Sequence, residues 1–202
     1  MMVRVLGAAA AVALVSTAVP AAAQQFSDGY EFLEAVRKQE GSKVDKFLRD
    51  KTLRIVNTKD RNTGEGALHI AANRNDALYL RVIVQQDDAN INLTDRRGNT
   101  ALLLAAGRGW EEGVTILLRY KANVNLANAS GETPLIRAVQ VHNIEVVRAL
   151  LNAGADPDRT DSVTGKSARD YARESARWPA ITKLLTDAPK VQRGGAASGP
   201  KL

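Results

Sequence analysis

The chain of 202 residues contains no cysteine, so it forms no disulfide, no thiolate metal site and no cysteine nucleophile. Aromatic residues make up only 4% of it. Its core must therefore come from small aliphatic side chains, which suit closely stacked helices. No segment after the first 23 residues is apolar enough to span a membrane as a helix, so we expect no stable membrane insertion.

The first 23 residues have the layout of a secretory signal peptide. Arg4 supplies a positive start, residues 5–19 form an apolar run, and three alanines at 21–23 precede Gln24. The apolar run is shorter than the ~20 residues that a membrane-spanning helix needs, which disfavours an anchor. We expect cleavage after Ala23. The alanine-rich signal and arginine-rich mature chain favour a bacterial protein of the periplasm.

The excess of basic residues does not indicate nucleic-acid binding. There are 28 lysines and arginines against 22 acidic residues. Four of the basic residues are Arg4, Lys190, Arg193 and Lys201, which leaves 24 against 22 in residues 24–188. A folded part that is nearly neutral lacks the positive charge needed to bind the phosphates of a nucleic acid strongly. The tail, residues 189–202, has glycine, proline and basic residues without periodicity and should be disordered.

An internal repeat is the dominant feature of the sequence. The repeated segments read GEGALHIAA at 64–72, GNTALLLAA at 98–106, GETPLIRAV at 131–139 and GKSARDYA at 165–172. Their leading glycines are spaced 34, 33 and 34 residues apart. A second register follows at matching offsets, with NIN at 90–92, NVN at 123–125 and DPD at 156–158. The chain is therefore predicted to stack similar units.

Each unit combines turn and helix signals. Gly98 and its equivalents suit a sharp turn because glycine tolerates positive φ. Thr100 and Thr133 can cap a first helix, and Pro134 fits its first position. Apolar residues at helical spacing, such as Val114, Leu117 and Leu118, predict a second helix in each unit.

This pattern resembles the ankyrin repeat. The matches include Thr133-Pro134-Leu135, Ala67-Leu68-His69 and the closing Gly154-Ala155-Asp156, and the resemblance covers residues 28–188. It implies an all-α solenoid of about five helix-turn-helix units with short β-turn fingers. The expected boundaries are 1–23 for the signal peptide, 26–60 for a degenerate N-terminal capping repeat, 61–94, 95–127 and 128–160 for ankyrin repeats, 161–188 for a C-terminal capping repeat and 189–202 for the tail.

The two terminal units should present polar outer faces, because nothing stacks on them. The first unit is expected to carry Arg37, Lys38 and Glu40 on its outer surface. In the last unit, Arg169 and Arg173 stand where inner units carry leucine and alanine.

Few residues indicate chemistry. His69 occupies the histidine position of the resembled motif, which implies a bracing role. The alternative, a catalytic base, lacks a serine or cysteine nucleophile beside it. Asp87-Asp88 lack the spacing of a calcium loop, and Gly165-Lys166-Ser167 lack the upstream glycine of a phosphate loop. We expect no metal, no cofactor and no enzymatic activity.

The resemblance implies that turn tips and inner-helix ends line a concave recognition groove. The candidate partner-binding residues are Arg61, Glu65, Arg74, Arg96, Arg97, Asn99, Arg108, Trp110, Glu132, Gln140 and Lys166. Arginine and tryptophan are enriched in interface hot spots. The alternative is a solvated arginine cluster and a half-buried Trp110 that packs between units. Arg137 stands at an inner-helix position usually apolar, so it must reach solvent or a carboxylate.

The resulting hypothesis is a monomeric periplasmic scaffold, not an enzyme, that binds another protein with an acidic surface and binds no nucleic acid. The alternative is an envelope-surface protein, in which the arginine cluster and the basic tail attract anionic lipid or cell-wall polymer.

Overall fold

The computed structural model describes residues 21–174 and 177–189. In this part of the chain, α-helices follow one another in pairs, and the only extended pairing consists of isolated bridges at Thr94–Thr100 and Thr160–Ser167. The helices are α1 (Ala21–Lys38), α2 (Gly41–Arg49), α3 (Ala67–Asn73), α4 (Ala77–Val84), α5 (Ala101–Gly107), α6 (Glu111–Arg119), α7 (Pro134–Gln140), α8 (Ile144–Asn152), α9 (Ala168–Glu174) and α10 (Pro179–Asp187), with a short 3-10 helix η1 at Ile55–Asn57. The predicted all-α array of paired helices is confirmed.

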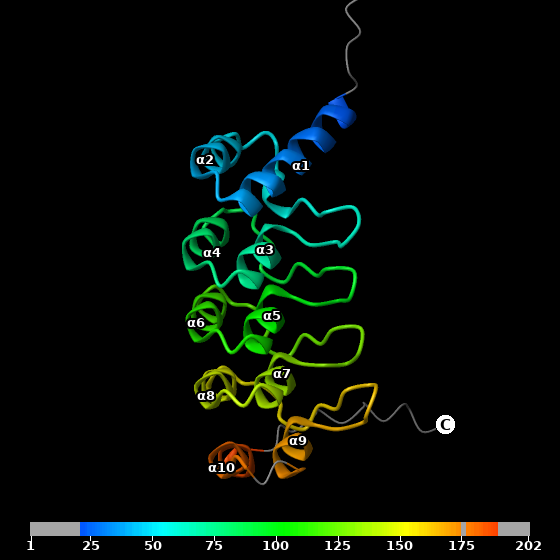
Figure 1. Ribbon diagram of the computed structural model, residues 1–202, viewed down its shortest axis with the longest axis vertical. Coiled ribbons are helices and arrows are strands. Elements are labelled where there is room, and N and C mark those ends of the chain that lie inside the picture. Colours follow the sequence, from blue (N-terminus) through cyan, green and yellow to red (C-terminus); the bar gives the residue numbers. More distant parts are fainter. Residues whose placement is uncertain (1–20, 175–176, 190–202) are drawn as a thin grey trace, which may run out of the picture.

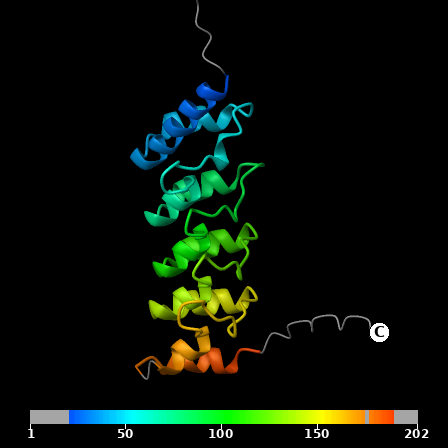
Figure 2. The ribbon, with the colours of Figure 1, turned by 90° about the vertical axis from the view of Figure 1, so that its right-hand side faces the viewer.

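The units stack in one column. The odd-numbered helices form an inner layer, the even-numbered helices form an outer layer, and hairpin-like fingers project from the inner side (Figure 1). Figure 2 looks from the finger side and shows the same single column. Fully buried alanines such as Ala72, Ala105 and Ala138 let neighbouring inner helices approach closely.

The inner helices begin where the threonine pattern predicts. Thr100 Oγ1 accepts the Leu103 backbone N–H at 3.2 Å, and Thr133 Oγ1 accepts that of Ile136 at 3.2 Å. Each bond satisfies one of the backbone donors left free in the first turn of a helix. Pro134 occupies the first turn of α7, where its missing N–H costs nothing.

The fingers hold one another through their backbones. Arg96 N–H donates to Thr63 C=O at 3.1 Å, Ala129 N–H to Arg97 C=O at 2.9 Å, and Ser162 N–H to Ser130 C=O at 2.8 Å. Gly98 has a φ of +78° at one such tip, and a Cβ there would lie only 2.8 Å from the Ala129 nitrogen. The repeated glycine therefore serves both the turn and the close approach of the next finger.

Asparagines connect the units on another edge of the array. Asn90 N–H donates to Asn57 Oδ1 at 2.8 Å, and Asn123 N–H donates to Asn92 Oδ1 at 2.7 Å. Asp156 N–H continues the series by donating to an asparagine side chain at 2.8 Å. The NIN and NVN segments thus have a structural role, because they join each unit to the next.

The first unit is tied to the first finger by an ion pair that reverses one expectation. Arg37, expected on the outer surface, turns inward and places Nη2 2.8 Å from Asp60 Oδ2. Asp60 Oδ1 also accepts the backbone N–H groups of Asn62 at 2.8 Å and Thr63 at 3.0 Å. The Thr63 N–H, followed by the Arg37 guanidinium, lowers the pKa of the Asp60 carboxyl to about 2.

The expectation for Arg169 is wrong. Its side chain is 8% exposed, and Nε contacts Asp158 Oδ1 at 2.8 Å. Its guanidinium also donates to the carbonyls of Leu185 and Ala188, at the carboxyl end of α10. Unpaired carbonyls at a helix end attract a cation, so Arg169 caps α10 from inside the last unit. Arg173 is exposed, as expected.

The predicted signal peptide and tail lie largely outside the described residues, which begin at Ala21 and end at Pro189. Residues 21–23 form the start of α1. Among the residues that the structure describes, no helix combines the length and the apolar character needed to cross a membrane.

Candidate functional site

A hollow of about 630 Å³ opens on the finger side of the inner helices, between the finger at residues 95–99 and the finger at 128–132. We call it the arginine hollow. It is lined by Arg96, Arg97, Asn99, Leu103, Leu104, Gly107, Arg108, Asn128, Ala129, Ser130, Glu132 and Arg137. The structure therefore brings together five of the predicted site residues, Arg96, Arg97, Asn99, Arg108 and Glu132. It adds Arg137, Asn128 and Leu104.

Arg108 is held against the preceding unit. It directly follows α5, and its Nε donates to the Asn73 carbonyl, the last residue of α3, at 2.9 Å. Arg74 directly follows α3 in the same way and donates to the Arg37 carbonyl near the end of α1. Each arginine thus satisfies a carbonyl at the negative end of a neighbouring helix.

Arg96 and Arg97 are exposed at a finger tip but differ in their contacts. Arg96 Nη2 donates to the carbonyl of Arg61 in the preceding finger. The backbone of Arg97 is bonded on both sides, whereas its guanidinium makes no hydrogen bond or ion pair with the residues described. Arg97 therefore has all its side-chain donors available.

Among the residues that the structure describes, Glu132 is the one carboxylate that lines the arginine hollow. It accepts from Asn128 Nδ2 at 2.8 Å and lies 3.4 Å from Arg137 Nη1. Arg137 Nη1 also lies 3.3 Å from Gln140 Oε1, at the end of α7. The expectation that Arg137 reaches a carboxylate is confirmed.

The other predicted groove residues lie in neighbouring units and are internally paired. Glu65 Oε1 accepts from Asn73 Nδ2 at 2.9 Å. Lys166 Nζ lies 2.7 Å from Glu174 Oε2 in the last unit. Arg61 stands at the tip of the first finger and offers its carbonyl to Arg96.

Trp110 does not line the arginine hollow. It is half-buried at the start of α6, and it packs against the hydrophobic core. Its ring lies against Gly113, where an added Cβ would sit only 2.0 Å from a ring carbon. These contacts favour the interpretation of Trp110 as a packing residue.

His69 braces two units. Its ring is fully buried, Nδ1 accepts the Gly66 N–H at 3.0 Å, and Nε2 lies 2.9 Å from the Asn99 carbonyl. Because a carbonyl only accepts, the neutral ring carries its proton on Nε2. Burial lowers the pKa of His69 below its usual value. Because the Nδ1 lone pair already accepts the Gly66 N–H, His69 is engaged in bracing the two units.

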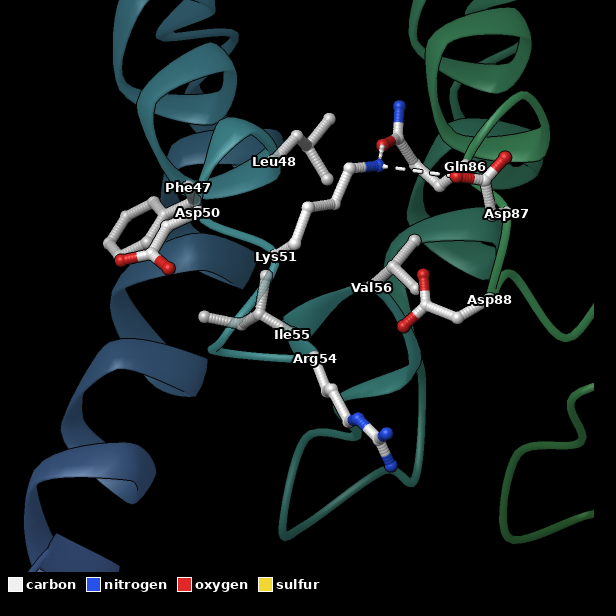
Figure 3. Close-up of a pocket in the computed structure, with 10 residues that line it drawn as sticks. All are labelled: Phe47, Leu48, Asp50, Lys51, Arg54, Ile55, Val56, Gln86, Asp87 and Asp88. Atoms are coloured by element: carbon white, nitrogen blue, oxygen red, sulfur yellow. Dashed lines mark hydrogen bonds and ion pairs between the residues drawn. The ribbon is translucent and has the colours of Figure 1, made fainter.

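A second hollow, of about 190 Å³, lies where the loop after α2 meets the end of α4 (Figure 3). Lys51 Nζ lies 3.3 Å from Gln86 Oε1 and 3.8 Å from Asp87 Oδ2. Asp50 stands on the opposite side of this hollow from Asp87 and Asp88 (Figure 3). Within residues 21–174 and 177–189, no three histidine, cysteine or acidic side chains gather into a metal-binding group.

Comparison with known proteins agrees with the architecture. Residues 68–161 match the family model described as ankyrin repeats in three copies. Similar curated proteins include BCL-6 corepressor-like protein 1 from Homo sapiens (38% identical over 133 residues), the E3 ubiquitin-protein ligase KEG from Arabidopsis thaliana (30% over 139) and the nuclear factor NF-kappa-B p105 subunit from Gallus gallus (29% over 122). These alignments cover 66%, 67% and 54% of this chain but 7%, 8% and 12% of the relatives. The likeness therefore concerns the repeat array alone.

Proposed function

Because the chain is an ankyrin-repeat protein, and such repeats typically mediate protein–protein interaction, we propose that it is a non-enzymatic scaffold that binds a partner protein. The binding surface is the finger side of the array, centred on the arginine hollow. The observation that carries this proposal is Arg97, an exposed guanidinium beside a hollow of about 630 Å³ and free of bonds to the described residues. Arginine with unused donors is a residue type enriched in interface hot spots.

We further propose that the protein is exported and works in a bacterial periplasm. The support is the positive start, apolar run and small residues of positions 1–23. Cleavage after Ala23 would remove three residues of α1 and leave its buried residues Phe32 and Leu33 in place. N-terminal sequencing of the chain recovered from a periplasmic extract should begin at Gln24; a first residue of Met1 would refute the proposal.

The binding surface is tested with one charge reversal and a matched control. Arg97→Glu changes the arginine hollow without breaking a bond of the described structure. Arg119→Glu makes the same change at an exposed residue that ends α6, in the outer layer. Arg108 is left unchanged, because a carboxylate there would face the Asn73 carbonyl and weaken the fold.

The three proteins are immobilised and exposed to a periplasmic extract of the source cells, and retained proteins are identified by mass spectrometry. We expect a partner that the wild type and Arg119→Glu retain and Arg97→Glu loses. Equal retention by all three would refute the groove assignment. If nothing is retained and the chain sediments with the envelope only while residues 189–202 are present, the surface-binding alternative is favoured.

A further inference from the structure

The arginine hollow offers unused hydrogen-bond donors and few free hydrogen-bond acceptors. The polar side chains of its fingers already satisfy one another: Asn128 Nδ2 donates to Asn99 Oδ1 at 3.0 Å, and Asn99 Nδ2 donates to Asp95 Oδ2 at 2.9 Å. Glu132 is engaged by both Asn128 and Arg137. The guanidinium N–H groups of Arg97 are unused among the residues that the structure describes. A ligand that fits this surface must therefore supply acceptors.

The charge of the arginine hollow is also unbalanced. Within the described part of the chain, four arginines line it against the single carboxylate of Glu132. Arg96 and Arg108 bond to backbone carbonyls, which are neutral, so their positive charge is not cancelled. Arg97 has no counter-ion among the residues described. A concave surface with several uncancelled charges of one sign attracts the opposite charge.

The excess is largest at the arginine hollow, although Arg74 in the preceding unit also bonds to a neutral backbone carbonyl. One unit away, the Arg37 guanidinium is paired with Asp60 at 2.8 Å. At the other end, Lys166 is paired with Glu174 at 2.7 Å. Glu65 stands in the finger before the arginine hollow, and its hydrogen bonds within the described part of the chain come from the neutral Thr63 hydroxyl and Asn73 amide. A long polyanion such as nucleic acid would meet these carboxylates on either side, whereas a short anionic segment would not.

Resting on the proposed function, we propose that the arginine hollow recognises carboxylate side chains of a short acidic segment in the partner protein. Guanidinium groups bind carboxylates through two parallel hydrogen bonds, which suits the free donors of Arg97. Leu103 and the half-buried Leu104 provide apolar floor beside the arginines. An acidic residue next to an aliphatic one matches both features.

Two of the arginines are already positioned for this role. Arg108 is fixed on the end of α3 and Arg96 on the carbonyl of Arg61, so a ligand need not order them. Ordering a long side chain at an interface costs conformational entropy, a cost that these bonds remove from binding. Arg97 alone must be ordered when the segment docks.

The test measures fluorescence anisotropy of a short, dye-labelled oligoglutamate peptide titrated with the full chain. Oligoglutamine and oligolysine peptides of the same length are the peptide controls. We expect oligoglutamate alone to bind, with an affinity that falls as salt rises. Arg97→Gln should weaken binding about tenfold, the equivalent of one lost charge-assisted hydrogen bond. Arg119→Gln, which removes the same charge from the outer layer, should not.

Two results would overturn the inference: no binding of oligoglutamate, or equal weakening by Arg97→Gln and Arg119→Gln. The second would mean attraction by net charge alone. The capture experiment separates this failure from that of the proposed function. A partner still lost by Arg97→Glu would keep the groove and exclude only the acidic segment, whereas failure of both experiments would exclude the groove itself.

Discussion

The tight stacking of the fingers can be tested at one glycine. Gly98 has a φ of +78°, so an alanine there is strained by roughly 1–2 kcal/mol. Its Cβ would also sit 2.8 Å from the nitrogen of Ala129, which donates to Arg97 C=O at 2.9 Å. The next finger must then move and weaken that bond, at a further cost of about 0.5–1.5 kcal/mol. We expect Gly98→Ala to lower the free energy of unfolding by about 2–3 kcal/mol.

The array contains two controls that separate strain from contact. Gly154 has a φ of +87° and Gly165 a φ of +68°, and a Cβ at either position would meet nothing within 4 Å. Alanine at these positions should therefore cost the strain alone. Gly165 is the equivalent glycine of the last finger. Gly154 follows α8 in an inner unit, so together they also control for position along the array.

The measurement is urea unfolding followed by far-ultraviolet circular dichroism. Gly98→Ala should lose about 1 kcal/mol more than either control, with an unchanged dependence on urea. If Gly98→Ala and Gly154→Ala lose the same free energy, the fingers do not press on one another in solution, and the reasoning is wrong.

Three further predictions concern buried and bridging side chains. His69→Ala should lower the free energy of unfolding by about 2–4 kcal/mol, because it leaves two backbone groups unpaired and opens a cavity. Since the pKa of His69 is lowered in the folded state, the unfolded chain takes up the proton first, and the wild type should lose stability as pH falls below about 6.5. The variant should lack this pH-dependent loss in urea titrations at several pH values. The pKa of Asp60 is about 2 in the fold and about 4 in the unfolded chain, so its ionised carboxyl stabilises the fold above pH 4 and this stabilisation is lost as pH falls toward 2. In the same urea titrations, Asp60→Asn should reduce the loss of unfolding free energy between pH 4 and 2 by about 2 kcal/mol. Arg108→Gln should lower the unfolding free energy by about 1 kcal/mol and Arg97→Gln should not, because only Arg108 satisfies a helix-end carbonyl; equal values in the same urea assay would count against that distinction.

The order of helices and turns could be predicted from the sequence because local rules and the repeat agree in the inner units. Thr100 and Thr133 precede apolar runs at the same offset, and both cap helices as expected. The finger glycines show the positive φ that their spacing indicates. These properties depend on residues within a few positions of one another, so they can be predicted from the sequence without knowledge of the packed structure.

The directions of the long basic side chains could not be predicted in this way. Arg37 and Arg169 were expected to face solvent, yet their partners Asp60 and Leu185 lie 23 and 16 residues away. A flexible stem lets arginine turn either way from the same backbone position, and only the packed units decide which. The sequence did contain one indication of such a role. Arg74 and Arg108 each directly follow an inner helix, and each donates to a carbonyl at the end of the preceding inner helix.

The sequence near Trp110 contains an indication of its packing role that its residue type does not give. Gly113 lies three residues further on in α6, so it shares a helix face with the residue that begins the helix. A glycine at that spacing leaves room for a large ring, and the indole lies against it. The residue type suggested an interface, but the neighbouring glycine indicated packing.

The arginines that hold the units together do not lose their capacity to attract a ligand. A carboxylate partner would cancel the charge of Arg108, whereas the Asn73 carbonyl satisfies part of its hydrogen bonding and leaves the charge in place. The same holds for Arg96 on the Arg61 carbonyl. Neutral acceptors thus hold these two guanidinium groups in place beside the arginine hollow, and the positive charge of the groups still attracts an anion to it. Stacking and the proposed recognition therefore share side chains. A substitution at Arg108 should change both, whereas one at Arg97 should change recognition alone.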